Sequence, residues 1–156
     1  MRDIISEDNL SHGIKVMPVE RFFDTNILLY GYDLDESAKR PIAKSLIEEA
    51  WKHPRRTAIS VQVLQEFHVN FVRKGHTPAE AATLLEDFTV WPVIDNTLAL
   101  FNLGISLQAR WQLSLWDAMI LAAAKASEAK ELISEDFSHG QDYGGVRAIN
   151  PFREAS

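Results

Sequence analysis

Cysteine is absent from the 156-residue chain, which excludes both a disulfide framework and a metal site built from thiolates. The five histidines are scattered and form no HExxH pair, so a catalytic zinc site is not expected. The chain also lacks a GxxxxGK(S/T) loop, which argues against a nucleotide-binding P-loop protein.

Long apolar runs and an excess of positive charge are missing as well. No run approaches the roughly 20 residues of a membrane-spanning helix, and the first residues lack the apolar centre of a signal peptide. We therefore expect a cytoplasmic protein without a membrane partner. The net charge of −6 argues against a protein that coats nucleic acid. It is compatible with an enzyme that touches nucleic acid over a small area, and it favours a basic partner.

The composition suits one folded domain, because 46% of the residues are apolar and 24% are charged. Segments with the pattern of short strands alternate with segments of helical spacing. Pro92 indicates that its strand lies at an edge of the sheet. The alternation predicts an α/β domain with a parallel sheet sandwiched between helices. We expect strands at 19–24, 57–60, 90–94, 131–134 and 146–149, and helices at 35–52, 61–74, 78–88, 96–111 and 114–129.

We place the domain at residues 18–152, between an N-terminal extension (1–17) that is expected to be mobile and a short tail (153–156). The extension contains ISEDNLSHG, which is close to ISEDFSHG at residues 133–140. This match is either a duplicated copy of the later loop or a coincidence. No catalytic role is expected for Asp8, because no strong strand precedes it.

Asp24 lies at the end of the first predicted strand and is flanked by apolar sequence on both sides. A carboxylate is costly to bury without a partner. Ligands of open α/β sheets bind outside the carboxyl ends of the strands. We interpret Asp24 as the first member of an acidic site. The alternative is an Asx-turn that only closes the strand.

Three further carboxylates occupy similar places: Glu66 early in a helix, Asp117 near the start of an apolar helix, and Asp136 after a strand. Each has an ordinary alternative, namely a solvated helix edge for Glu66 and a loop acid for Asp136. Ser114 and Asp117 also fit a capping box. The helix that follows is apolar nearly all round from residue 116 to 124, so we expect it to be buried.

In a parallel sheet these four positions share one edge, so the four side chains can converge there. An all-oxygen site suits Mg²⁺ or Mn²⁺. Without a cation, clustered carboxylates would repel each other and raise their own pKa values.

These residues give the chain a resemblance to the PIN-domain family, most closely to VapC-type toxins of bacterial toxin–antitoxin systems. The resemblance covers about residues 19–152 and is carried by residues 23–28, 63–67, 115–120, 134–137 and 149–152. It implies an endoribonuclease that uses one or two Mg²⁺ or Mn²⁺ ions. It also implies an RNA substrate, a cognate antitoxin whose basic tail blocks the site, and a homodimer.

By position, the resemblance makes Asp24, Glu66, Asp117 and Asp136 the acidic quartet, with Thr25 or Asn26 as a polar helper. We expect Asp24 and Asp117 to bind the first ion and Asp136 to complete its shell or hold a second ion. Glu66 would orient the attacking water or bind the second ion. Thr25, Asn26 and Ser114 are expected to hold these ligands by hydrogen bonds. A further acid, Glu135 or Asp142, remains an open choice.

Because the protein is acidic overall, an anionic substrate must be bound by local clusters of positive charge. The candidates are Arg55 with Arg56, Arg73 with Lys74, Arg110, and Arg147. Four aromatic residues on predicted helices belong to the core or to an interface, with the core favoured for most: Trp51, Phe71, Phe88 and Trp111.

Two rival functions fit less well. A phosphatase of the haloacid-dehalogenase type needs a second Asp two residues after the first, and Asn26 occupies that place. The other rival is a PIN-like module that only binds or assembles. The presence of all four acids argues against it.

Overall fold

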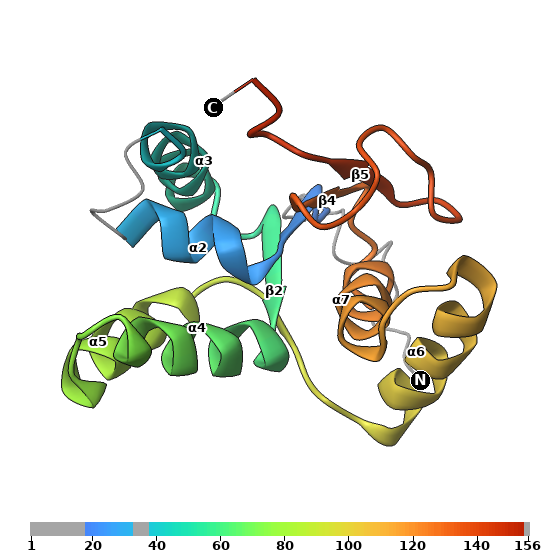
Figure 1. Cartoon of the computed structure of the whole chain (residues 1–156), viewed down its shortest axis with the longest axis horizontal. Coiled ribbons are helices and arrows are strands. Elements are labelled where there is room, and N and C mark those ends of the chain that lie inside the picture. Colours follow the sequence, from blue (N-terminus) through green and yellow to red (C-terminus); the bar gives the residue numbers. More distant parts are fainter. Residues whose placement is uncertain (1–17, 33–37, 155–156) are drawn as a thin grey trace, which may run out of the picture.

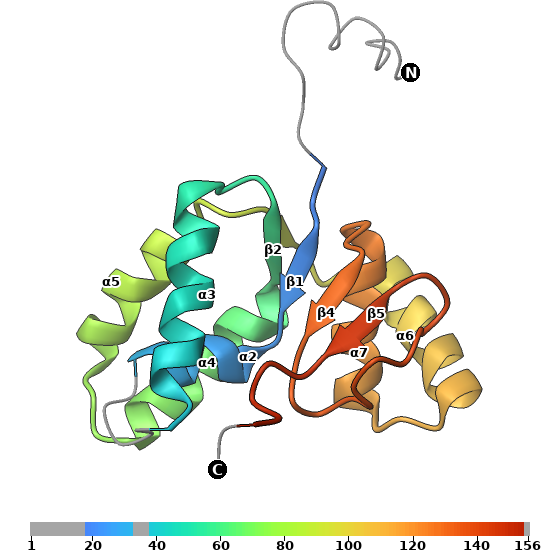
Figure 2. The same ribbon diagram turned by 90° about the horizontal axis from the view of Figure 1, so that it is seen from above.

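The first strand of the sheet lies in its centre. The computed structural model describes residues 18–32 and 38–154. Within them the strands are β1 (Arg21–Phe23), β2 (Thr57–Ser60), β3 (Val93–Ile94), β4 (Glu131–Ile133) and β5 (Arg147–Ile149), labelled where space allows in Figure 1. All pairs are parallel, in the order β3-β2-β1-β4-β5, and Figure 2 shows β2, β1, β4 and β5 side by side. The predicted parallel sheet is confirmed, with Pro92 next to an edge strand.

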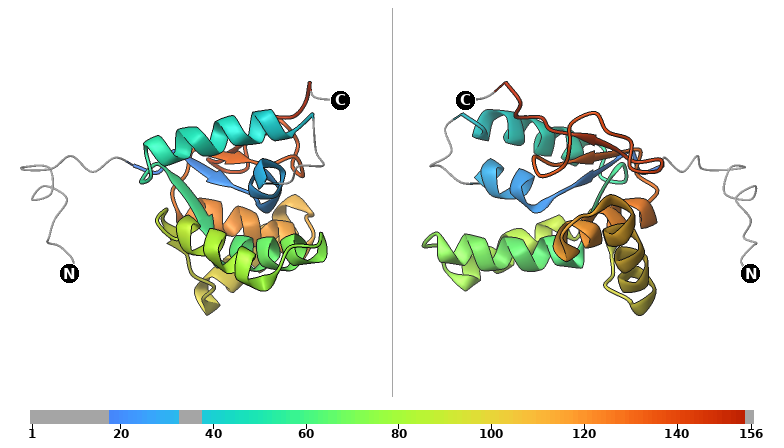
Figure 3. Two further views of the ribbon diagram at one scale, coloured as in Figure 1. Left: turned by 90° about the vertical axis from the view of Figure 1, so that its left-hand side faces the viewer. Right: turned by 45° about the vertical axis from the view of Figure 1, so that its right-hand side comes forward.

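Helices cover both faces of this sheet, as predicted. The described helices are α2 (Thr25–Tyr32), α3 (Arg40–Lys52), α4 (Val61–Arg73), α5 (Pro78–Phe88), α6 (Leu98–Trp111) and α7 (Leu115–Ala126). Figure 3 shows α3 on one side of the sheet and α4, α5, α6 and α7 on the other. Helix α2 packs between α3 and α4, just beyond the end of β1. No described helix is long and apolar enough to cross a membrane.

The core lies on both sides of the central strands. Phe22 and Phe23 of β1 are fully buried on opposite faces, as alternation along a strand requires. Phe23 meets Trp91 edge-on at 6.0 Å between ring centroids. Of the four aromatic residues proposed above for core or interface, Phe71 and Phe88 are buried in the core, and Trp51 and Trp111 are half-buried and pack against it.

One helix was not predicted, and several boundaries differ from the prediction. The apolar run after Asp24 forms α2, a helix that we did not predict because eight residues are too few to show a clear period. Of the helix predicted from residue 35, residues 35–37 lie outside the described part of the chain, and α3 begins at Arg40, with Pro41 in the first turn where its missing N–H costs nothing. The strand predicted from Val90 begins at Val93, because the N–H groups of residues 90 and 91 donate to the preceding turn.

The predicted apolar helix is α7, and residues 118–124 along it are buried as expected. Its first turn is different, because the Trp116 side chain is 65% exposed. The prediction that this helix is buried from residue 116 onward is therefore wrong for Trp116. Asp8 and the near-repeat at residues 5–13 lie outside the described residues.

Candidate functional site

The site lies where the strand order reverses. From β1 the chain builds outward through β2 to β3, and it then returns to place β4 on the other side of β1. Such a switch point opens a crevice outside the carboxyl ends of the two adjacent strands. Asp24 directly follows β1, and Ser134 and Asp136 follow β4. The sheet topology therefore places these residues together although more than 100 positions separate them.

Asp24 is held from both sides. Its Oδ1 accepts from the Thr25 N–H at 2.7 Å, and its Oδ2 accepts from the Ser134 hydroxyl at 2.7 Å. The side chain is only 6% exposed. Burial raises the pKa of Asp24 to about 7, and the charges of Asp136 and Glu66 add to this effect, while the bonds from Ser134 and Thr25 oppose it.

Glu66 reaches the same site from α4. Ser60 caps this helix by accepting from the Val63 N–H, so the helix begins directly after β2 and carries Glu66 at the carboxyl edge. The Thr25 hydroxyl donates to Glu66 Oε1 at 2.5 Å, and Gln62 Nε2 donates to Oε2 at 3.1 Å. Thr25 therefore links the two acids: its backbone N–H donates to Asp24, and its side-chain hydroxyl donates to Glu66.

Asp117 lies in the first turn of α7. Ser114 is the N-cap of the helix, and its hydroxyl accepts from the Asp117 N–H at 3.1 Å, which is one half of the predicted capping box. Partial burial raises the pKa of Asp117 and the charge of Glu66 adds to it, while the hydrogen bond with Ser114 lowers it. The capping position and the acidic site are therefore compatible.

Asp136 completes the group of four acids. Its N–H donates to the Ser134 hydroxyl oxygen at 3.0 Å. Its pKa is raised by the surrounding protein, which displaces water, and by the charges of Asp117, Glu135 and Glu66, while Lys39 lowers it. These electrostatic effects place Asp136 among the other acids.

Ser134, like Gln62, contacts an acid of the site and was not predicted from the sequence. It is 1% exposed, donates to Asp24 and accepts from the Asp136 N–H, so it joins the carboxyl ends of β1 and β4. The available signal was a hydroxyl residue at the end of a strand, two positions before a candidate acid. That pattern is too common to identify a contact with a residue 110 positions away.

The structure separates the two candidates for a further acid. Glu135 accepts from Asn26 at 3.1 Å, from Lys39 at 2.9 Å, and from the Tyr30 hydroxyl. The charge of Glu135 is therefore neutralised by Lys39 beside the site. Asn26, which we expected to hold a metal ligand, donates its hydrogen bond to Glu135. Asp142 lies in the later loop, where it accepts from the Gly145 N–H at 2.7 Å and approaches Arg147 at 4.0 Å.

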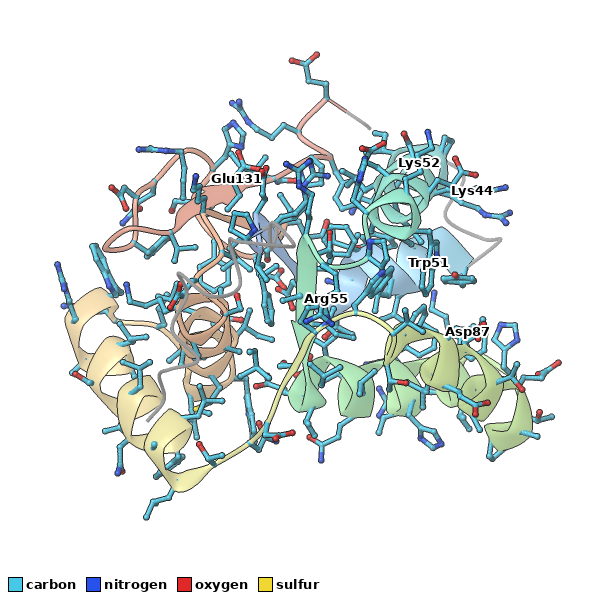
Figure 4. All side chains as sticks on the ribbon, turned by 180° about the vertical axis from the view of Figure 1, so that it is seen from behind. Lys44, Trp51, Lys52, Arg55, Asp87 and Glu131 are labelled. Atoms are coloured by element: carbon cyan, nitrogen blue, oxygen red, sulfur yellow. The ribbon has the colours of Figure 1, made fainter. Side chains whose placement is uncertain are left out.

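Most of the predicted basic clusters lie away from these acids. Arg55 and Arg56 precede β2, at the amino edge of the sheet, which faces the viewer in Figure 4 with Arg55 labelled. Arg73 ends α4, seven residues beyond Glu66 and hence about 10 Å along the helix axis. Arg147 starts β5 and donates to the Gly140 carbonyl. Arg110, near the end of α6, is the nearest of them to Asp117 along the chain.

The donor chemistry of the four acids fits a hard divalent cation. All donors are carboxylate oxygens, and their mutual repulsion would be relieved by a cation. As the side chains lie, no three acidic or histidine side chains within residues 18–32 and 38–154 are grouped closely enough to hold a metal ion.

Comparisons with known proteins agree on the family. The family model described as PIN domain matches residues 21–140. A toxin–antitoxin complex from Klebsiella pneumoniae contains a chain that is 25% identical, with a TM-score of 0.63, covering 85% of this chain and 98% of that one. VapC20 of Mycobacterium tuberculosis, a toxin that cleaves the sarcin-ricin loop, is 23% identical with a TM-score of 0.59, over 75% and 92% of the two chains. A DNA-bound VapBC from Salmonella typhimurium is 16% identical with a TM-score of 0.61, over 85% and 98%. Among curated proteins, no sequence matches significantly.

Proposed function

The chain belongs to the PIN-domain family, and on this premise we propose that it is a metal-dependent endoribonuclease, the toxin of a toxin–antitoxin pair. The observation that carries the proposal is the acidic group at the switch point, where Asp24 is buried beside other acids and bonded to hydroxyl and amide groups. A carboxylate maintained in this environment is typical of a functional site. The Klebsiella pneumoniae complex and the Mycobacterium tuberculosis toxin support the toxin role.

Asp24, Asp117 and Asp136 would hold Mg²⁺ or Mn²⁺. A bound divalent cation neutralises phosphodiester oxygens and makes a bound water more acidic. Asp24 must lose its proton to serve as a ligand, and its pKa of about 7 places this step near neutral pH. The hydroxyl of Ser134 and the N–H of Thr25 favour the ionised form, because both donate to the carboxylate.

Glu66 would orient the water that attacks the phosphorus atom. Thr25 and Gln62 each donate to one of its oxygens, which fixes the plane of the carboxylate. Because the carboxylate is already held in one orientation, it can direct a water molecule without a further loss of entropy during the reaction. Asp117 comes from a different helix, α7, where it lies in the first turn next to the N-cap residue Ser114.

The partners we propose are RNA, an antitoxin with a basic segment, and a second copy of the chain. The net charge of −6 suits a basic antitoxin segment. Leu98, Phe101 and Ile105 form an exposed apolar stripe on α6, with helical spacing. An exposed stripe of this kind suits a protein contact. The mass of the purified chain in solution tests whether it pairs with itself.

The decisive experiment is cleavage of a mixed structured RNA by the purified chain in Mg²⁺, in Mn²⁺ and in chelator. Asp117→Asn is prepared identically, and Asp87→Asn, an exposed acid on α5, is the matched control. We expect the wild-type chain to cut RNA only when metal is present. Asp87→Asn should make the same cuts, and Asp117→Asn should make none. Equal cutting by Asp117→Asn would contradict the proposal.

A Mn²⁺ titration addresses the rival function. A binding or assembly module that has lost catalysis should bind Mn²⁺ weakly or not at all. Saturable binding by the wild-type chain, weakened by Asp24→Asn, is the expected result. No Mn²⁺ binding together with no cutting would favour the rival.

A further inference from the structure

Trp116 differs from the other tryptophans of the described chain. Trp91 is 1% exposed, and Trp51 and Trp111 are half-buried with ring partners. Trp116 is 65% exposed, and its ring has no aromatic or cationic partner among the described residues. A large flat apolar surface in water is unfavourable, so its presence needs a reason.

The backbone of Trp116 is fixed to the acidic group. Gln62, which is 7% exposed, donates through Nε2 to both the Trp116 carbonyl at 3.2 Å and Glu66 at 3.1 Å. The next residue is Asp117, one Cα step of about 3.8 Å along the chain. The first turn of α7 therefore carries an acid of the site and an exposed ring on one rigid element.

The direction of the ring follows from helix geometry. Side chains tilt toward the N-terminus of their helix. The N-terminus of α7 is the end that bears Asp117, at the carboxyl edge of the sheet. The Trp116 side chain therefore leans along the helix axis toward the carboxyl edge of the sheet, the edge at which we propose that the phosphodiester is cut.

Charge alone grips an anionic substrate poorly at this edge. Of the predicted basic clusters, only Arg110 lies near Asp117 in the chain, and Lys39 is paired with Glu135. Stacking of a base on an aromatic ring requires no positive charge and tolerates any base.

We propose that Trp116 is a base-stacking platform that positions an unpaired nucleotide of the RNA next to the acidic site. This inference rests on the ribonuclease function proposed above. It requires a substrate whose nucleotide beside the cut is unstacked, as in a loop or a single strand. Trp116 contacts the substrate and does not take part in the chemical step.

The test measures binding of a fluorescently labelled single-stranded RNA of random sequence in chelator, so that no cutting occurs, and cleavage of structured RNA in Mg²⁺. We expect Trp116→Ala to weaken binding about 5- to 150-fold, the range for one stacked base. Trp116→Phe should recover most of this loss, whereas Trp116→Leu should not. Val90→Ala, at an exposed apolar residue before β3, is the control and should bind like wild type.

The salt dependence separates stacking from charge. Arg110→Gln should reduce the slope of log affinity against log salt by about 1, if this side chain contacts a phosphate. Trp116→Ala should lower the affinity at every salt concentration and leave the slope unchanged.

Three results would overturn the inference in distinguishable ways. RNA binding and cleavage by Trp116→Ala at wild-type levels would remove the ring from the substrate site. Loss of self-association by this variant, with unchanged RNA affinity, would assign the ring to a protein contact. A wild-type chain that neither binds nor cuts RNA would refute the proposed function itself.

Discussion

The two edges of the sheet treat their charged residues differently. At the amino edge, Glu20 pairs with Arg56 at 3.2 Å, and Glu49 lies 3.6 Å from His53. At the carboxyl edge, burial and the charges of Asp136 and Glu66 raise the pKa of Asp24, whose side chain accepts a hydrogen bond from the uncharged Ser134 hydroxyl. Exposed ion pairs contribute little to stability, whereas a buried unpaired carboxylate destabilises the fold unless something binds it. The less favourable charges therefore lie at the edge where we propose the functional site.

The largest expected effect is on cleavage. Asp24→Asn keeps the shape of the side chain and removes its charge, so we expect at least a 10³-fold loss of cutting, in line with losses from groups that act in the transition state. Glu20→Gln removes an acid from the other edge and should cut within about twofold of wild type, because its ion pair lies outside the site. Initial cleavage rates in Mg²⁺ measure both. Similar losses in the two variants would erase the contrast between the edges.

The next effect is on stability in chelator. The pKa of Asp24 is 3.8 in the unfolded chain and about 7 when folded, so the folded state keeps a proton that the unfolded state has lost. The free energy of unfolding therefore falls as pH rises from about 4 to 7. The decrease is up to about 4 kcal/mol, because each unit of pKa shift corresponds to about 1.4 kcal/mol. We expect Asp24→Asn to exceed wild type in urea unfolding at pH 8 and to match it near pH 4.

Divalent cation should reverse the loss at high pH. Ions that bind the folded chain alone stabilise it by mass action. Adding Mn²⁺ at pH 8 should therefore raise the urea midpoint of wild type and leave that of Asp24→Asn nearly unchanged. A wild-type stability that does not change with pH would refute the assignment of a buried acid at this edge.

A smaller effect is expected from the hydroxyl that joins the two strands. Ser134→Ala removes a donor from Asp24 and so raises the pKa of that carboxyl further. Cleavage at pH 7 should fall about 10- to 100-fold, the usual cost of losing a partner of a metal ligand. The rising limb of the pH–rate profile should move to higher pH. Ser127→Ala, at the end of α7, is the control and should keep the wild-type profile.

The smallest effect distinguishes the two acids left open by the sequence. Glu135→Gln weakens the bonds from Lys39, Asn26 and Tyr30 and should cost about 1–2 kcal/mol of stability, as for a hydrogen bond to a charged group. Asp142→Asn, on an exposed loop, should cost less than about 0.5 kcal/mol. Thermal unfolding of the two variants measures this difference. An equal cost would show that the network around Glu135 carries no special stability.

The sequence predicted the elements that carry strong local signals. Helix α5 begins and ends at the predicted residues, with a capping box formed by Thr77 and Glu80, and both termini of α4 fall within one residue of the prediction. The edge position of β3 followed from Pro92, which has no N–H to donate. The four acids could be selected because a carboxylate beside apolar sequence needs a physical explanation.

What escaped prediction depends on contacts between distant residues. The bond from Ser134 to Asp24 exists only because β4 pairs with β1, and no local pattern encodes that pairing. The exposure of Trp116 was also invisible, because an apolar residue at the start of an apolar helix looks buried by composition alone. The choice between Glu135 and Asp142 required the positions of Lys39 and Tyr30, which come from a different part of the chain.

The central position of β1 has a consequence for the timing of synthesis. Asp24 is among the earliest residues of the domain to be made, but its partner strand β4 begins only at residue 131. Pairing over such a separation is slow and late in folding. During translation the acidic group therefore cannot assemble until nearly the whole domain has emerged. For the ribonuclease that we propose, this strand order would keep the site incomplete until residues 131–136 have been synthesised.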